Sequence, residues 1–191
     1  MRIVHFSWEF PPVIFGGLGT FAMEITQKQK AMGNDITVFS LNRANKLRTS
    51  DNWNGISVYR PTNLDIAKPL DFCINSELQS WGDNFQFFSD VMGYNLFSAS
   101  KLVNMLTDNG GKSFDVIDAH DWLGIMGGIV AKKALGLPLM FHVHSTETGR
   151  SVGYGSETIK EIEYNGGQIA DCVITVSYAM KDELKRLGFP E

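Results

Sequence analysis

Residues Ser7–Phe21 read SWEFPPVIFGGLGTF, and this stretch decides the fold. The apolar run Ile3–Phe6 before it predicts a buried first strand, at about Arg2–Ser7. The pattern from about Leu18 to Met32 predicts the first helix. A glycine-rich turn therefore joins the first strand to the first helix, which is where a doubly wound α/β domain binds phosphate.

The glycines of this turn are Gly16, Gly17 and Gly19. Glycine lets a ligand approach the backbone closely, and the N–H groups at the start of a helix attract anions. The same residues would also suit a tight strand–helix turn that binds nothing. Their spacing matches neither the G-x-G-x-x-G dinucleotide fingerprint nor a Walker motif, which argues against a P-loop NTPase.

The composition of the chain fits one soluble domain spanning residues 1–191. Hydrophobic residues make up 43% and charged residues 20% of its 191 positions, and the net charge is −4. That charge gives no basic footprint for nucleic acid or an anionic membrane. No run of about 20 apolar residues is available to span a bilayer. The chain starts directly in a strand, without a signal-peptide pattern.

The two cysteines, Cys73 and Cys172, form neither a metal cluster nor a disulfide framework. Their neighbours suggest that both are buried as reduced thiols. Reduced thiols favour a cytoplasmic location.

The rest of the chain alternates strands with helices. Further strands are expected at Ile36–Leu41, Ile56–Arg60, Phe114–Ala119, Pro138–Val143 and Cys172–Val176, and helices at Phe85–Asn109, Leu123–Leu135, Ser156–Ile169 and Tyr178–Leu187. Asn42–Asn54 and Gly149–Gly155 are expected to be loops, and Asn63–Asn84 is the least legible region. This order predicts a Rossmann-like, doubly wound and mostly parallel sheet with helices on both faces.

Three of the helices carry recognisable faces. One face of the first helix is expected to carry Phe21, Ile25 and Met32. The long helix 85–109 has an apolar stripe that should cover a face of the sheet, made of Phe88, Val91, Met92, Leu96, Ala99, Leu102, Val103 and Leu106. Small residues on the helix 123–135 should let it pack close to the sheet, namely Gly124, Gly127, Gly128 and Ala131.

Ligands of such a sheet lie outside the carboxyl ends of its strands. The glycine turn, His120-Asp121 and the segment 142–150 all follow strands, so they should meet at this edge. Asp121 could orient sugar hydroxyls or sense charge at a reacting carbon, or it could only cap a helix. His120 could belong to the site or to the core.

Two histidines lie at the carboxyl end of strand 138–143, His142 within the strand and His144 directly after it. His142 and His144 point to the same face if the strand stays extended. His144, nearer the strand end, is the better functional candidate. A metal site from this pair, with Glu147 as a third ligand, is a weak alternative. Arg150 could bind a phosphate or carboxylate, or form an ion pair.

The opening stretch resembles that of glycogen and starch synthases and their relatives among retaining GT-B glycosyltransferases. The resemblance continues in DVIDAHDW (Asp115–Trp122), LMFHVHSTE (Leu139–Glu147), NGGQIADCVITVS (Asn165–Ser177) and the final YAMKDEL. It covers essentially the whole chain, in the order of the family.

This resemblance implies an enzyme of two Rossmann-like domains that transfers a sugar from a nucleotide sugar, with no metal or other cofactor. The chain matches the N-terminal, acceptor-side domain. The C-terminal nucleotide-binding domain is the expected partner, so the chain alone should be inactive. The expected donor is ADP- or UDP-glucose, and the expected acceptor is an α-1,4-glucan.

The resemblance also assigns roles to residues. It implies catalytic roles for Asp121 and His144 and donor-phosphate contacts for Gly16, Gly17, Leu18 and Gly19. Weaker substrate contacts are expected from Glu9, His120, Thr146 and Arg150.

Two positions depart from the pattern of glycogen synthases. Ile14 stands where those enzymes typically have Lys, and Thr20 where they commonly have Asp or Glu. A related transferase with another nucleotide sugar and a lipid, glycan or small-sugar acceptor therefore stays open. So does a sugar-binding module without catalysis.

Overall fold

The computed structural model describes residues 1–65, 83–107 and 113–190. Within these residues the strands form one seven-stranded sheet in the order β3-β4-β2-β1-β5-β6-β7. The parallel strands are β1 (Arg2–Phe6), β2 (Asp35–Phe39), β4 (Ile56–Tyr59), β5 (Val116–His120), β6 (Leu139–Val143) and β7 (Cys172–Thr175). β3 (Ser50–Trp53) runs antiparallel to β4 at the edge of the sheet.

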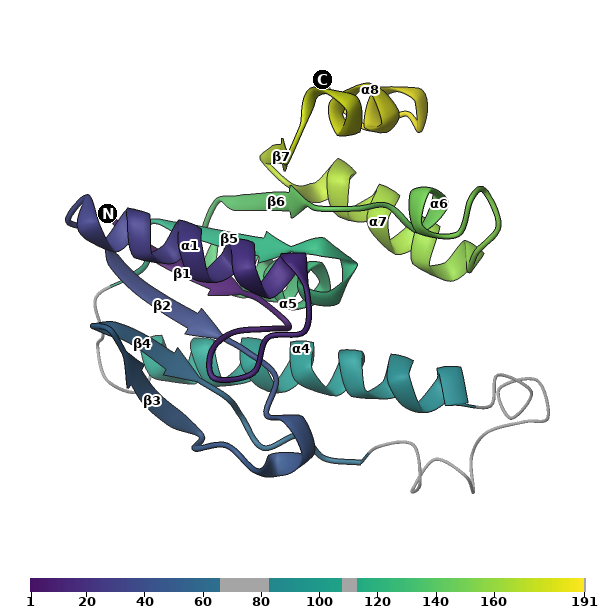
Figure 1. Cartoon of the computed structure of the whole chain (residues 1–191). Coiled ribbons are helices and arrows are strands. Elements are labelled where there is room, and N and C mark those ends of the chain that lie inside the picture. The colour runs from purple at the N-terminus through teal and green to yellow at the C-terminus, as the bar shows by residue number, and fades with distance from the viewer. Residues whose placement is uncertain (66–82, 108–112, 191) are drawn as a thin grey trace.

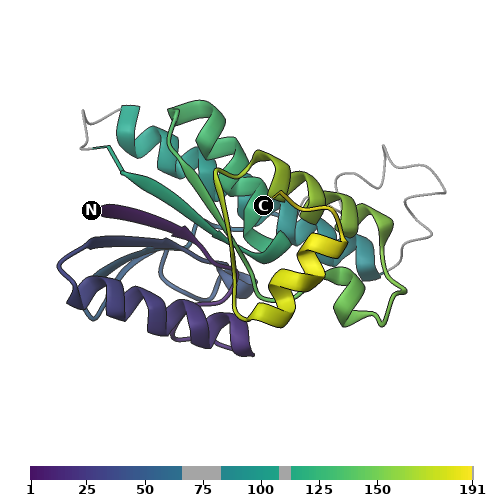
Figure 2. The ribbon, with the colours of Figure 1, turned by 90° about the horizontal axis from the view of Figure 1, so that it is seen from above.

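Helices cover both faces of this sheet (Figures 1 and 2). α1 (Gly17–Ala31) lies on one face, and α4 (Asp83–Thr107), α5 (Asp121–Leu135) and α7 (Glu157–Ile169) lie on the other. The short α6 (Glu147–Arg150), the final α8 (Tyr178–Arg186) and a 3-10 turn, η1 (Arg43–Asn45), complete the described elements. The predicted fold, a Rossmann-like doubly wound sheet, is confirmed.

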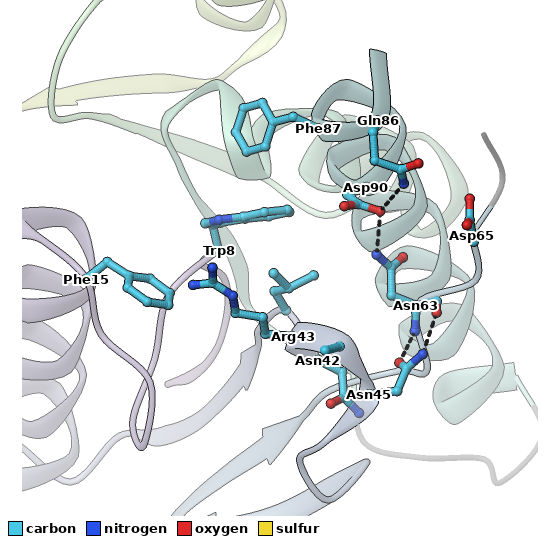
Figure 3. A pocket seen from close by; sticks show the side chains of 12 residues that line it. Trp8, Phe15, Asn42, Arg43, Asn45, Asn63, Asp65, Gln86, Phe87 and Asp90 are labelled. Atoms are coloured by element: carbon cyan, nitrogen blue, oxygen red, sulfur yellow. Dashed lines mark hydrogen bonds between the residues drawn. The ribbon is translucent and has the colours of Figure 1, made fainter. Parts of the chain in front are cut away.

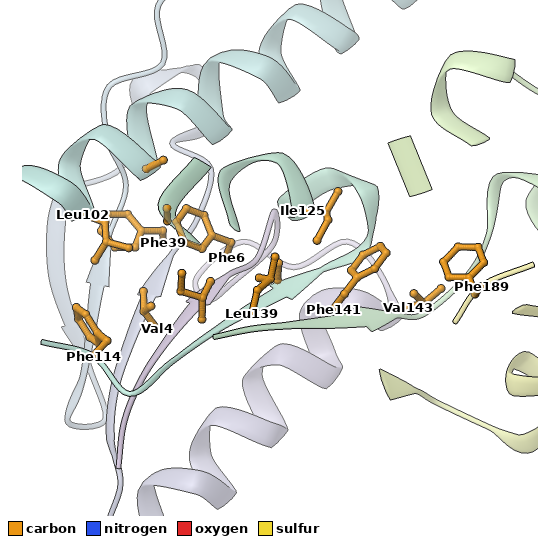
Figure 4. Packing of buried hydrophobic residues seen from close by; sticks show 14 of the residues in the cluster. Val4, Phe6, Phe39, Leu102, Phe114, Ile125, Leu139, Phe141, Val143 and Phe189 are labelled. Carbon is orange, nitrogen blue, oxygen red and sulfur yellow. The ribbon is translucent and has the colours of Figure 1, made fainter. Parts of the chain in front are cut away.

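The larger hydrophobic core fills the space between the sheet and α4, α5 and α7 (Figure 4). Strand alternation sends Val4 and Phe6 of β1 into this core, while Ile3 packs into the second cluster with Ala22 of α1. Each fully buried aliphatic or aromatic side chain contributes about 1.5–3 kcal/mol relative to exposure. The two cores hold the strands in register, so the strand ends lie at fixed positions.

The small-residue face of α5 is confirmed, and it has a steric reason. A Cβ added to Gly124 would lie 2.5 Å from the carbonyl oxygen of Phe6, and one added to Gly128 would lie 2.8 Å from Leu139. The helix axis can approach the sheet this closely only because these side chains are missing. The N-terminus of α5 is thereby held against the ends of β1 and β5.

Several local predictions were wrong. The predicted loop 42–54 contains β3, whose polar sequence SDNW shows no strand pattern and which forms by pairing with β4. α5 begins at Asp121 rather than Leu123, and α6 extends into the predicted loop 149–155. Cys172 is exposed, not buried. Cys73 and most of the segment 63–84 lie outside the described residues.

Two apolar side chains also lie outside the expected faces. Met32 is 79% exposed, because it follows the last turn of α1. Leu96 is 47% exposed, whereas the polar Asn95 and Ser98 of α4 are buried. No helix in the described part of the chain is long and apolar enough to cross a membrane.

Candidate active site

The glycine turn is the first part of the site. α1 begins at Gly17 after an extended Gly16, and no side chain caps the helix. A Cβ on Gly19 would come within 2.8 Å of Glu9 and 3.0 Å of Ile14, whereas a Cβ on Gly16 or Gly17 would meet nothing within 4 Å. Packing therefore requires glycine at position 19 alone. The exposed Gly16 and Gly17 are left open for a ligand that approaches the backbone.

Glu9 holds this turn in place. Its carboxylate accepts hydrogen bonds from the backbone N–H groups of Phe15 (2.9 Å) and Gly16 (3.0 Å). Leu18 lies half-buried in the first turn of α1. The role that the structure supports for Glu9 is thus to shape the turn, and its contact with substrate stays a prediction.

Asp121 is the most constrained residue at this edge. It has a φ of +54°, in the left-handed region that non-glycine residues rarely adopt. Its Oδ1 accepts a 2.7 Å hydrogen bond from the backbone N–H of His144, with a longer contact of 3.5 Å from that of Ser145. Asp121 therefore ties the start of α5 to the end of β6. The helix cap position belongs to His120, whose side chain makes no capping bond.

The protonation of Asp121 is also unusual. Burial raises its pKa to about 6, although the backbone N–H of His144 and the charge of Arg150 act in the opposite direction. Backbone strain of about 1–3 kcal/mol persists mainly where function requires it. A strained, buried carboxyl with a raised pKa is typical of a functional site.

Histidines form the floor of the site. His120 is fully buried on β5, and its Nδ1 lies 3.1 Å from Nε2 of His144. His142 is buried on β6, and its Nδ1 lies 2.6 Å from Oδ1 of Asp118. The ring of Phe21 on α1 meets that of His144 edge-on, at a centroid distance of 4.8 Å. The glycine-turn helix and the end of β6 are therefore in direct contact.

His144, directly after β6, is less buried than His142 within that strand. Burial lowers its pKa to about 4, so the ring is neutral at pH 7. A neutral imidazole can accept a hydrogen bond as well as donate one.

Thr146 and Arg150 brace the segment beyond β6. The buried Thr146 accepts a hydrogen bond from the N–H of Gly149 (2.9 Å) and donates one to Glu183. Arg150 donates to the carbonyl oxygen of Ser145 (3.0 Å) and to Glu163 (2.8 Å). Of the two alternatives for Arg150, the structure contains the ion pair.

Glu163 is a residue that sequence reasoning missed. It is 4% exposed, and it accepts hydrogen bonds from the N–H of Glu147 (2.9 Å) as well as from Arg150. Burial raises its pKa to about 7. Its burial could have been predicted from its spacing on α7. It lies four residues after Ile159 and three before Gly166, so it shares their inward-facing side of the helix.

A pocket of about 450 Å³ opens beside the glycine turn (Figure 3). Aromatic side chains form one side, and polar side chains that follow β2 and β4 or belong to α4 form the other. Its lining includes Trp8, Phe15 and Phe87, with Asn42, Arg43, Asn45, Asn63, Asp65, Gln86 and Asp90. In the sequence, the signal for this pocket was Asn42, directly after the predicted strand 36–41, together with Asn63, three residues after the predicted strand 56–60.

The polar side of the pocket is internally bonded. The Asn45 and Asn63 pair exchanges two 2.8 Å hydrogen bonds, and Asp90 accepts from Gln86 at 3.2 Å. Aromatic faces beside amide and carboxylate groups are the usual lining of a small-molecule site.

One group of residues in the described part of the chain has metal-ligand geometry. Ligand atoms of His5, Asp118 and His120 lie within 4.8 Å of one another, and all three residues are buried. These residues differ from the metal ligands that the sequence offered as an alternative, which were His142, His144 and Glu147. Imidazole nitrogens and a carboxylate would suit zinc, but His5 and His120 are hydrogen-bonded to each other at 3.1 Å. The absence of a metal cofactor stays a prediction.

Comparison with known proteins gives consistent matches. The model of Glycosyltransferase Family 4 matches residues 15–191. A glycogen synthase of Mycobacterium tuberculosis is 28% identical over 200 residues, and the match covers 100% of this chain and 45% of that protein. An uncharacterized glycosyltransferase of Methanocaldococcus jannaschii is 28% identical over 187 residues, covering 96% of this chain and 42% of the other.

Among solved structures, a sucrose-phosphate synthase from Thermosynechococcus elongatus has a similar fold. The TM-score is 0.72 at 15% sequence identity, and the match covers 97% of this chain and 44% of that one. The chain thus spans less than half the length of the relatives that it matches.

Proposed function

Because the chain belongs to Glycosyltransferase Family 4 and has the fold of one Rossmann-like half of a GT-B enzyme, we propose that it is the acceptor-side half of a glycogen-synthase-like enzyme. The enzyme transfers glucose from ADP-glucose or UDP-glucose to an α-1,4-glucan, with retention at the anomeric carbon. The observation that carries this proposal is that the open glycine turn and the strained Asp121 lie at one edge of the sheet. They are linked there through Phe21 and His144.

The glycine turn is proposed to bind the donor phosphates. The backbone N–H groups of Gly17, Leu18 and Gly19 lie in the first turn of α1, where a helix carries partial positive charge. Negative charge develops on the leaving diphosphate as the glycosidic bond breaks. Fixed amide dipoles stabilise that charge without reorganising.

Asp121 and His144 are proposed to act on the transferred sugar. An ionised Asp121 would lower the energy of an oxocarbenium-like sugar, which carries positive charge. Its raised pKa would leave it largely ionised at pH 7 to 8. A neutral His144 beside it suits a sugar hydroxyl.

The acceptor is proposed to bind in the pocket of Figure 3. Trp8 and Phe87 offer apolar ring surface for the C–H faces of a sugar, and the amide and carboxylate groups of Asn45 and Asp90 suit its hydroxyls. The pocket begins at Phe15, next to Gly16, so an acceptor there would lie near the donor phosphates.

A second Rossmann-like domain is proposed to supply the nucleotide site and the opposite wall of the cleft. On this proposal the chain alone is inactive, and the complete enzyme needs no metal. Sugar transfer that continues after a metal chelator is added would support the proposal that no metal is needed.

The test is a transfer assay on the protein joined to such a domain. ADP-[14C]glucose and UDP-[14C]glucose are supplied with glycogen, and label in the washed polymer is counted. Incorporation from either donor supports the proposal. No incorporation from both, in a protein that still hydrolyses or transfers another nucleotide sugar, overturns the glucan assignment.

A related transferase with another acceptor is the second candidate. Ile14 favours it, because this apolar side chain packs beneath Gly19 where glycogen synthases typically present a lysine. The same assay with small sugars and with lipid-linked acceptors separates the two.

A further inference from the structure

All four histidines of the sequence lie in one cluster: His5 on β1, His120 at the end of β5, His142 on β6 and His144 directly after β6. Three of them form a chain of hydrogen bonds that begins on α1. Gln29 Oε1 lies 2.8 Å from His5 Nε2, His5 Nδ1 lies 3.1 Å from His120 Nε2, and His120 Nδ1 lies 3.1 Å from His144 Nε2. The chain therefore connects a helix side chain to the candidate active site.

The positions of the hydrogens in this chain follow from its first member. In this orientation of the Gln29 amide its oxygen faces His5, and an amide oxygen only accepts, so His5 Nε2 carries a hydrogen. A neutral imidazole has one N–H, so His5 Nδ1 accepts from His120 Nε2. By the same reasoning His120 Nδ1 accepts from His144 Nε2. The remaining nitrogen, Nδ1 of His144, then has a lone pair and no hydrogen.

A second observation supports this direction. Asp118 is fully buried, and its Oδ2 has no hydrogen-bond partner among the described residues. Its neighbour His5 Nδ1 lies only 3.5 Å away. If that nitrogen already accepts from His120, it has no hydrogen to donate, and the unpaired Oδ2 agrees with this tautomer.

The histidines of the chain are also neutral, as the scheme requires. Burial lowers the pKa of His5 and His120, although the charge of Asp118 opposes this effect. Burial would by itself raise the pKa of Asp118, but the hydrogen bond that His142 Nδ1 donates at 2.6 Å favours the ionised carboxylate. The charge of the cluster is thus held by Asp118, whose other oxygen accepts from His142.

We propose that Gln29, acting through His5 and His120, is a positioning residue that fixes His144 with its hydrogen on Nε2 and an acceptor lone pair on Nδ1. This ring state lets His144 accept a hydrogen bond from the sugar hydroxyl that the proposed function places beside it, because a hydroxyl donates a hydrogen bond and an ionised phosphate does not. The second statement rests on the proposed function, whereas the state of the ring does not.

The direct test is the ring state itself. Long-range 1H–15N NMR spectra of the protein labelled with 15N-histidine distinguish a protonated ring nitrogen from one with a lone pair. The expected result is N–H at Nε2 and a lone pair at Nδ1 in His5, His120 and His144. The opposite pattern in His144 overturns the inference, whether or not the protein transfers sugar.

Two substitutions at one position test the causal role of Gln29. Gln29→Glu keeps an acceptor next to His5 and should preserve the ring states. Gln29→Lys places a donor there and should reverse the chain, so that His144 Nδ1 gains the hydrogen. The matched control is Gln27→Leu, because Gln27 lies on the same helix but does not take part in the series of hydrogen bonds from Gln29 to His144. Unchanged spectra in Gln29→Lys overturn the proposal.

In an active enzyme, Gln29→Lys should lower kcat about tenfold, which corresponds to the loss of one hydrogen bond to the sugar. Gln29→Glu should leave kcat close to that of the wild type. A loss in both variants would indicate a merely structural role and overturn the inference. Zinc present at one ion per chain would also overturn it, because a metal between His5 and His120 would occupy the nitrogens that the chain uses.

Discussion

The two sides of the candidate site differ in the groups that they present. The glycine side, Gly16–Gly19, offers the first backbone N–H groups of α1 at the exposed Gly17 and half-buried Leu18, with almost no side chains. The histidine side, with Asp121 and His144, consists of buried or half-buried side chains that are bonded to one another. Ligand binding on the glycine side should depend on the shape of the backbone. The action of the histidine side should depend on the charge and protonation of its side chains. Substitutions should therefore affect the two sides in different ways.

The largest effect is expected from Asp121→Asn. Asparagine tolerates the left-handed backbone and can still accept from the N–H of His144, so the fold should persist. Loss of the charge should lower kcat about 10²–10³-fold, the range seen when a group that stabilises the transition state is removed. Steady-state rates of the protein joined to the proposed second domain measure this.

Asp115→Asn provides the matched control. Asp115 lies just before β5, at the opposite end from the site, and accepts from the N–H of Arg2 at 2.7 Å. It should leave kcat unchanged. Similar rates for Asp121→Asn and wild type would remove the catalytic role from the histidine side.

On the glycine side, Gly17→Ala and Gly19→Ala separate binding from architecture. Alanine at 19 collides with Glu9, and overpacking of this kind costs about 1–3 kcal/mol of unfolding free energy. Alanine at 17 meets no atom within 4 Å, so thermal stability should be unchanged. If donor phosphates approach this backbone, Gly17→Ala should raise the donor KM about tenfold or more.

Thermal denaturation and donor kinetics measure the two effects. A normal donor KM in Gly17→Ala would mean that the glycine turn is only a connection between β1 and α1.

The sequence predicted these two sides unequally. Strand and helix periodicity placed the glycine turn, Asp121 and His144 at one edge, because parallel strands end together. Burial of the histidines depends on contacts between His5, His120 and His142 across three strands far apart in sequence. Local pattern cannot show such contacts.

The missed elements have a similar explanation. β3 has no apolar alternation, and only its pairing with β4 makes it a strand. The role of Glu9 in bonding the turn could not be read from its spacing, because it depends on how the loop folds back. Cys172 was expected inside because its strand is apolar, but β7 is the edge strand of the sheet.

A smaller effect is expected from Trp8→Ala in the pocket. Its ring packs edge-on against Tyr94 at 5.4 Å and Phe87 at 5.9 Å, so part of its surface faces the pocket. Loss of this surface should raise the acceptor KM about tenfold and leave the donor KM unchanged. Trp8→Phe keeps an aromatic ring and should show a smaller increase. A change in the donor KM instead would place the acceptor elsewhere.

The smallest effect concerns Glu163, which holds Glu147 and Arg150 beyond β6, and it tests whether this support of the site responds to pH. Burial raises the pKa of Glu163 from its ordinary value of 4.5 to about 7. The folded chain therefore binds this proton more tightly than the unfolded chain, so the free energy of unfolding falls as pH rises from about 4.5 to 7. Arg150 already opposes burial in this shift, and solvent screening around the partly exposed pair limits the change in unfolding free energy to about 1 kcal/mol. Glu163→Gln cannot lose a proton, so urea unfolding at pH 4.5, 5.5, 6.5 and 7.5 should show a shallower decline than wild type. Parallel curves would mean that Glu163 is ionised throughout and that Arg150 fully compensates its burial.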